Sequence, residues 1–143
     1  MRVAAVDLGS RRIGVAVSDG TGTLASPRCT VERSGDPDAD RASVVAAVLE
    51  AGAGHLVVGL PLSLDGRRRR AAVAAEEEAT ALRALLAPEG VDVETFDERL
   101  TTVSAERALA AAGRSGRTRR RVVDQAAAAV LLQTWLDARR PAR

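Results

Sequence analysis

The chain has 143 residues, 46% of them hydrophobic, and a formal net charge of only +2, which is typical of a folded domain and excludes a disordered chain. No apolar run reaches the ~18–20 residues of a membrane span, and the N-terminus lacks the basic-then-apolar plan of a signal peptide. The single Cys29 excludes an internal disulfide framework. We therefore expect a cytoplasmic protein without a membrane partner, with residues 1–143 forming a single domain.

Hydrophobic periodicity and turn residues predict the element order β-β-β-α-β-α-β-α-α. The predicted elements are strands over 2–8, 12–18 and 23–32, a helix over 40–51, a strand over 55–61, a helix over 69–87, a strand over 91–96, and helices over 101–113 and 123–138. Gly9 lies in the turn of the first hairpin, and Asp38 or Asp40 is suited to cap the first helix. His55 and Trp135 are interpreted as structural residues.

This order predicts an α/β fold. Three consecutive strands followed by alternating helices and strands indicate a mixed five-stranded sheet, with three antiparallel strands and then βαβ units, flanked by helices. Residues 114–121 contain no apolar side chain and are predicted as a mobile basic loop, and residues 139–143 as a tail.

The charges are unevenly distributed. Residues 112–143 contain eight arginines and two acids, and all 21 basic residues of the chain are arginine. Two segments are densely basic, Arg67–Arg70 and Arg114–Arg121. Such clusters indicate a polyanionic partner, although a solvated surface is the alternative for any run of charge.

Acidic residues lie where three predicted elements begin or end. Asp7 ends the first strand, the pair Asp97-Glu98 follows the last strand, and Asp124 opens the final helix. Carboxylates that converge from different elements can hold the ions of two-metal phosphodiester hydrolysis, and Mg²⁺ suits such a site because it keeps coordination places for water and phosphate. A turn former or a helix cap is the ordinary alternative for each acid, and spacing alone leaves their convergence open.

Four segments, "DLGSRRIGVAVSD", "VVGLPLSLDG", "DERLTT" and "VDQAAAAVLLQTWL", together resemble the YqgF family, also called RuvX-type. The resemblance extends from Arg2 to about Leu136 and implies a ribonuclease H-like fold. Members are described as Holliday-junction-resolvase-like and as nucleases of pre-16S rRNA 5′-end processing. By this resemblance the catalytic metal ligands fall on Asp7, Glu98 and Asp124, with Asp97 as a substitute for Glu98, and the cofactor is Mg²⁺ or Mn²⁺.

The resemblance also implies contacts to a nucleic-acid backbone. Arg12 has the alternative of only flanking its strand, and Arg99 that of pairing with a neighbouring acid. The run Arg67–Arg70 departs from the family pattern and opposes the helix dipole, which favours phosphate contact, and the loop 114–121 would close over bound nucleic acid. The arginines predicted to bind nucleic acid are Arg11, Arg12, Arg67, Arg68, Arg99, Arg117, Arg119 and Arg120.

A further departure concerns the metal site, because related resolvases carry a second acid one turn after the helix aspartate, where this chain has Ala127. Whether the site binds one or two metal ions therefore stays open.

The expected function is that of a metal-dependent nuclease in 5′-end processing of pre-16S rRNA. The alternatives are a Holliday junction resolvase and a non-catalytic nucleic-acid-binding module. Both pre-rRNA and branched DNA remain possible substrates, and both a monomer and a homodimer remain possible states.

Overall fold

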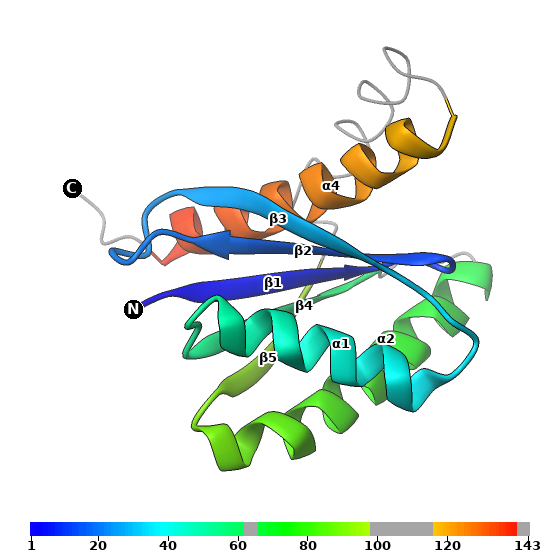
Figure 1. The fold of residues 1–143 in the computed structure, drawn as a ribbon, viewed down its shortest axis with the longest axis horizontal. Coiled ribbons are helices and arrows are strands. Elements are labelled where there is room, and N and C mark those ends of the chain that lie inside the picture. Colours follow the sequence, from blue (N-terminus) through cyan, green and yellow to red (C-terminus); the bar gives the residue numbers. More distant parts are fainter. Residues whose placement is uncertain (62–65, 98–115, 140–143) are drawn as a thin grey trace.

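The structure, a computed structural model, describes residues 1–61, 66–97 and 116–139. Five of its strands form one sheet in the order β3-β2-β1-β4-β5 (Figure 1). The elements are β1 (Val3–Leu8), β2 (Arg12–Ser18), β3 (Ala25–Glu32), α1 (Pro37–Glu50), β4 (His55–Leu60), α2 (Gly66–Leu86), a 3₁₀ turn η1 (Ala87–Glu89), β5 (Asp92–Asp97) and α4 (Gly116–Ala138). The helix predicted over 101–113 lies outside the described residues.

The sheet is mixed, as the sequence predicts. β2 runs antiparallel to both β1 and β3, whereas β4 is parallel to β1 and to β5. The first hairpin turns at Gly9, whose N–H donates to the carbonyl oxygen of Arg12 at 2.9 Å. A β-carbon on Gly9 would lie 2.6 Å from that same oxygen, so this tight turn excludes a larger residue.

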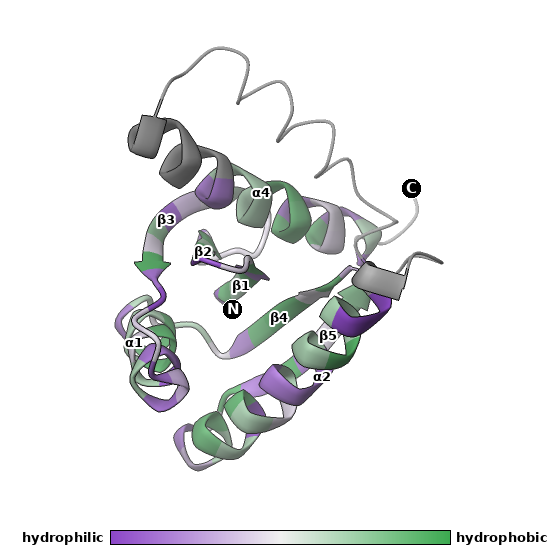
Figure 2. Ribbon diagram, turned by 90° about the vertical axis from the view of Figure 1, so that its right-hand side faces the viewer, coloured by the Kyte–Doolittle hydropathy of each residue, from purple (hydrophilic) through white to green (hydrophobic). Residues whose placement is uncertain are grey.

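Helices cover both faces of the sheet. Figure 2 shows α4 on one side of β1, β2 and β3, with α1 and α2 on the other side. Side chains of β1 alternate between the two cores: Ala4 and Val6 join the cluster with α1 and α2, whereas Val3 and Ala5 join the cluster with α4. Trp135 belongs to the α4 cluster and is only 5% exposed, which confirms its structural interpretation.

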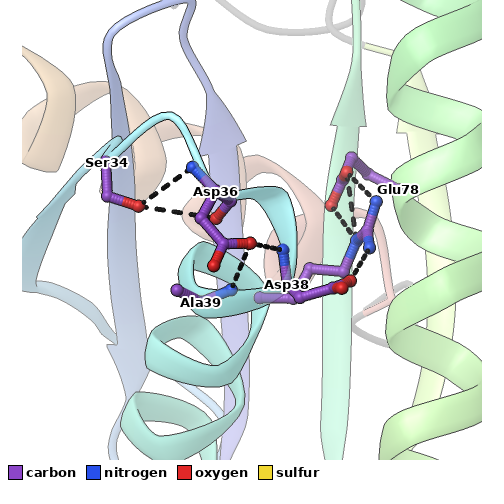
Figure 3. Close-up of polar contacts among 6 residues, drawn as sticks. Ser34, Asp36, Asp38, Ala39 and Glu78 are labelled. Carbon is purple, nitrogen blue, oxygen red and sulfur yellow. Dashed lines mark hydrogen bonds and ion pairs between the residues drawn. The ribbon is translucent and has the colours of Figure 1, made fainter.

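α1 starts earlier than predicted, and its cap is neither Asp38 nor Asp40. The cap is Asp36, whose carboxylate accepts from the backbone N–H groups of Asp38 and Ala39 (Figure 3). Pro37 follows at the first helical position, where its fixed φ and missing N–H cost nothing. Asp40 is buried instead and accepts from the backbone N–H and hydroxyl of Ser34.

The predicted basic loop is a second correction. α4 begins at Gly116, so residues 116–121 form its first turns, and only 114 and 115 of the predicted loop lie outside the described residues. Arginine is a good helix former even without an apolar neighbour, and the absence of apolar side chains was therefore a poor indicator of a loop. Among the described helices, none is long and apolar enough to cross a membrane.

Candidate functional site

Asp7 lies on the face of the sheet that α4 covers. It follows Val3 and Ala5 at alternate positions of β1, and both of these side chains pack in the α4 cluster. Asp7 is only 5% exposed, which is unusual for an acid, because burying a carboxylate is costly without compensating partners. The cross-strand partner of Asp7 in β2 is Gly14.

Gly14 is the contact point between β2 and α4. A β-carbon on Gly14 would lie 2.0 Å from the carbonyl oxygen of Asp124 and 2.5 Å from its carbonyl carbon. The backbone of α4 therefore passes directly over Gly14, the residue paired with Asp7. The fold thus brings Asp7 and Asp124, from opposite ends of the sequence, to one place on the sheet.

Arg12 forms an ion pair with one of these acids. Its Nε donates to Asp124 Oδ2 at 3.3 Å, and its Nη1 lies 3.8 Å from Glu32 Oε2. Only 11% of the Arg12 side chain is exposed, so its guanidinium faces acids of this protein. The neighbouring Arg11 is exposed in the hairpin turn, as a contact to a nucleic-acid backbone requires.

For the other predicted site residues, the structure gives only the element in which they lie, or does not describe them. Glu98 and Arg99 lie outside the described residues. Five arginines lie in the first turns of α2 and α4, namely Arg67, Arg68, Arg117, Arg119 and Arg120.

Asp97, the predicted substitute for Glu98, is the last residue of β5 and pairs with Leu60 of β4. It is half-buried, and its neighbour Phe96 packs against the α4 cluster. The role of Asp97 as a substitute for Glu98 stays a prediction.

The described residues include two of the three predicted metal ligands. Over 1–61, 66–97 and 116–139, no group of three His, Cys, Asp or Glu side chains is arranged to hold a metal ion. Asp7 and Asp124 supply two carboxylates, and the third predicted ligand, Glu98, is outside these ranges. Carboxylate oxygens are the donors that Mg²⁺ and Mn²⁺ prefer, so the chemistry of the two placed acids suits these ions.

Two residues of the site were missed from the sequence. Gly14 interrupts an otherwise apolar strand, and a glycine inside a strand indicates a close approach of another backbone. Arg33 stabilises the hairpin through two hydrogen bonds. Its side-chain Nε donates to the carbonyl oxygen of Gly9 at 2.7 Å, and its backbone N–H donates to the carbonyl oxygen of Arg11 at 2.9 Å. No sequence signal pointed to Arg33, because it lies beyond β3.

The far end of α4 is anchored by a second group of contacts. His55 Nε2 lies 2.5 Å from Glu94 Oε1, and the His55 ring stacks on Trp135 with 5.1 Å between centroids. Arg139 covers the Trp135 ring at 4.2 Å from its centroid and also reaches Glu94. His55 therefore has an acidic partner in space that the local sequence did not reveal, and its role in α4 packing is structural.

The chain is similar to known proteins over nearly its whole length. Residues 1–138 match a family model described as "RuvX: Holliday junction resolvase". A protein of Myxococcus xanthus (strain DK1622) is 46% identical over 141 residues, which cover 99% of this chain and 91% of that protein. A protein of Thermobifida fusca (strain YX) is 51% identical over 143 residues, covering 95% and 87%. Both are named "Putative pre-16S rRNA nuclease".

Solved structures with a similar fold are those of RuvC. A T. thermophilus RuvC in complex with a Holliday junction substrate has a TM-score of 0.60 at 17% identity, over 97% of this chain and 95% of that chain. A second Thermus thermophilus RuvC structure has a TM-score of 0.51 at 18% identity, over 97% and 96%. These matches confirm the predicted fold class. The family match and the relatives' names agree with the expected enzyme class, a nuclease that hydrolyses phosphodiester bonds.

Proposed function

The chain belongs to the RuvX family, and from that premise we propose that it is a metal-dependent nuclease that acts in 5′-end processing of pre-16S rRNA. The proposed substrate is the one that the names of its relatives give. The observation that carries the proposal is the place of the buried Asp7, which pairs with Gly14 beneath the backbone of Asp124.

Asp7, Asp124 and Glu98 are proposed as the three carboxylates of the site. Glu98 comes directly after β5 in the sequence, and its role is taken from the family resemblance. Asp7, buried on a central strand, would give the site its most rigid ligand.

These carboxylates are proposed to bind Mg²⁺ or Mn²⁺. A divalent cation held there would supply the positive charge that activates a water and stabilises the leaving oxygen of a phosphodiester. The protein contributes by holding the carboxylates at fixed positions on the sheet and on α4.

Nucleic-acid binding is proposed to depend on arginine contacts to phosphates. Arg11 is exposed at the hairpin, and further arginines lie in the first turns of α2 and α4. Contacts of this kind position a nucleic acid without reading its sequence. They also make affinity fall with salt, because neutralised phosphates release their counterions.

A second candidate substrate is the four-way DNA junction. The specific observation in its favour is the description of the matching family model, a Holliday junction resolvase. Symmetric cleavage of a junction requires two active sites, so this activity would need a homodimer. The third possibility, a nucleic-acid-binding module without catalysis, would bind both substrates and cleave neither.

The test compares cleavage of two substrates by three proteins. Wild type, Asp7→Asn and the control Asp92→Asn, an exposed acid at the start of β5, are incubated with a 16S rRNA precursor and with a four-way junction, with Mg²⁺, with Mn²⁺ or with EDTA. We expect metal-dependent cleavage of the precursor by wild type and by Asp92→Asn. Asp7→Asn should be slower by about 100-fold or more, the cost of losing one electrostatic stabiliser of a transition state.

Circular dichroism and the melting temperature establish that each variant is folded, and gel-shift assays measure its binding. Equal cleavage by wild type and Asp7→Asn would overturn the nuclease site. Binding of the nucleic acids by all three folded proteins, with cleavage by none of them, would identify a binding module. Faster cleavage of the junction than of the precursor, together with a dimer in sedimentation, would identify the resolvase.

A further inference from the structure

Arg12 is held beneath α4 by the sheet itself. It is the first residue of β2, where it pairs with Glu32 of β3, and its carbonyl oxygen accepts from the N–H of Gly9. Alternation along β2 puts it on the same face as Gly14 and Ala16, and Ala16 packs in the α4 cluster. The guanidinium therefore reaches Asp124 from a fixed backbone position.

The ion pair is largely withdrawn from water. The side chain of Arg12 is 11% exposed and that of Asp124 is 18% exposed, so solvent screens their interaction much less than it screens a surface pair. Removing one partner of such a pair leaves a poorly solvated charge on the other. Arg12 thus balances negative charge at the place where the fold gathers Asp7 and Asp124.

We propose that Arg12 is a resident counter-ion of Asp124 with which a divalent cation must compete at the candidate metal site. This inference rests on the proposed function, because it needs Asp124 to be a metal ligand. A cation and a guanidinium on the same carboxylate repel each other, so Arg12 lowers the affinity of the site for the metal. It also stabilises the metal-free fold, since the acids are partly neutralised before any metal binds.

The matched control is Arg41. It also forms an ion pair from a largely covered side chain, 25% exposed, with its Nη2 2.9 Å from Glu78 Oε1. That pair joins α1 to α2 on the opposite face of the sheet. Arg41 also pairs with Asp38, as Arg12 also pairs with Glu32, so losing either arginine removes one charge and two ion pairs. Of the two arginines, only Arg12 contacts an acid of the candidate site.

The experiment measures Mn²⁺ binding by isothermal titration calorimetry and melting temperature with and without Mn²⁺ for wild type, Arg12→Gln and Arg41→Gln. We expect Arg12→Gln to bind Mn²⁺ about tenfold more tightly than wild type, the scale of one charge next to a divalent ion in a solvated site. Its melting temperature should fall without metal and recover in Mn²⁺. Arg41→Gln should also melt earlier, but its Mn²⁺ affinity should equal that of wild type.

Binding of Mn²⁺ by folded Arg12→Gln with the wild-type affinity, or more weakly, would overturn the proposal. If Arg12→Gln is unfolded without metal, Mn²⁺ must restore its fold, and no recovery would overturn the proposal equally. The proposed metal site fails in a different way, through the absence of Mn²⁺ binding by wild type or through equal binding by wild type and Asp7→Asn.

Discussion

Gly14 of β2 lies directly beneath Asp124 of α4, so closely that a β-carbon on the glycine would be 2.0 Å from the aspartate's carbonyl oxygen. The contact is between two backbones, and neither can move aside by a change of rotamer. It sets the height of α4 above the sheet at the point where Asp7 pairs with Gly14. The separation of the two acids therefore depends on a residue without a side chain.

The first prediction follows from this contact. Gly14→Ala should push α4 away from β2 and lower the free energy of unfolding by about 1–3 kcal/mol or more, the cost of forcing a methyl group into a packed interior. The rate of cleavage by the folded variant should also fall, because moving α4 away from the sheet separates the carboxylates of Asp7 and Asp124. Urea unfolding and the precursor cleavage assay measure the two effects.

Gly20→Ala is its control. Gly20 lies in the β2–β3 turn, and nothing lies within 4 Å of a β-carbon built on it. This variant should unfold at nearly the wild-type urea concentration and retain activity. Equal losses in Gly14→Ala and Gly20→Ala would mean that the close approach of α4 does not matter.

Much of this fold could be predicted from the sequence, because local patterns determine it. The alternation of Ala4 and Val6 with Val3 and Ala5 is visible in the sequence as an unbroken apolar run, typical of a strand buried on both faces. The three consecutive strands, and the placement of Asp7 at the end of the first, follow from such patterns.

The remaining features depend on contacts between distant residues. The ion pair of Arg12 with Asp124 and the pair of His55 with Glu94 join different elements, and no local spacing predicts them. The start of α4 at Gly116 was missed because apolar periodicity indicates only the part of a helix that packs against the core.

The second prediction concerns the anchor at the C-terminal end of α4. Trp135 is 5% exposed, stacks on His55 and is covered by Arg139. Trp135→Ala should lower the free energy of unfolding by about 3–5 kcal/mol, because a large side chain leaves a cavity. Trp135→Phe keeps a ring for His55 to stack on and should lose less.

Leu85→Ala is the matched control, since Leu85 is a large apolar residue that is 49% exposed. Urea unfolding followed by circular dichroism applies to all three variants, whereas tryptophan fluorescence does not, because Trp135 is the single tryptophan of the chain. A loss in Trp135→Ala no larger than that in Leu85→Ala would show that α4 is held at this end by other contacts.

The third prediction concerns the turn between β2 and β3, which Asp19 organises. Its Oδ2 accepts from the hydroxyl of Thr21 at 2.6 Å, and its Oδ1 accepts from the backbone N–H groups of Thr23 and Leu24 at 2.8 and 3.1 Å. These hydrogen bonds, that of Thr21 first, lower the pKa of Asp19 from 3.8 to about 2. They favour the charged carboxylate, which accepts more strongly than the protonated form.

Because folding lowers this pKa, the unfolded chain takes up the proton first as the solution is acidified. The stabilisation by Asp19 is therefore complete above about pH 4 and is lost as the pH falls towards about 2. The difference in urea midpoint between wild type and Asp19→Asn should be constant from about pH 7 to about pH 5 and should shrink below about pH 4.

The variant Thr21→Ala removes the largest cause of the pKa shift of Asp19. In this variant the pKa of Asp19, measured by NMR titration, should lie closer to 3.8. A midpoint difference that stays constant down to about pH 2 would mean that these hydrogen bonds do not distinguish the charged carboxylate from the neutral acid.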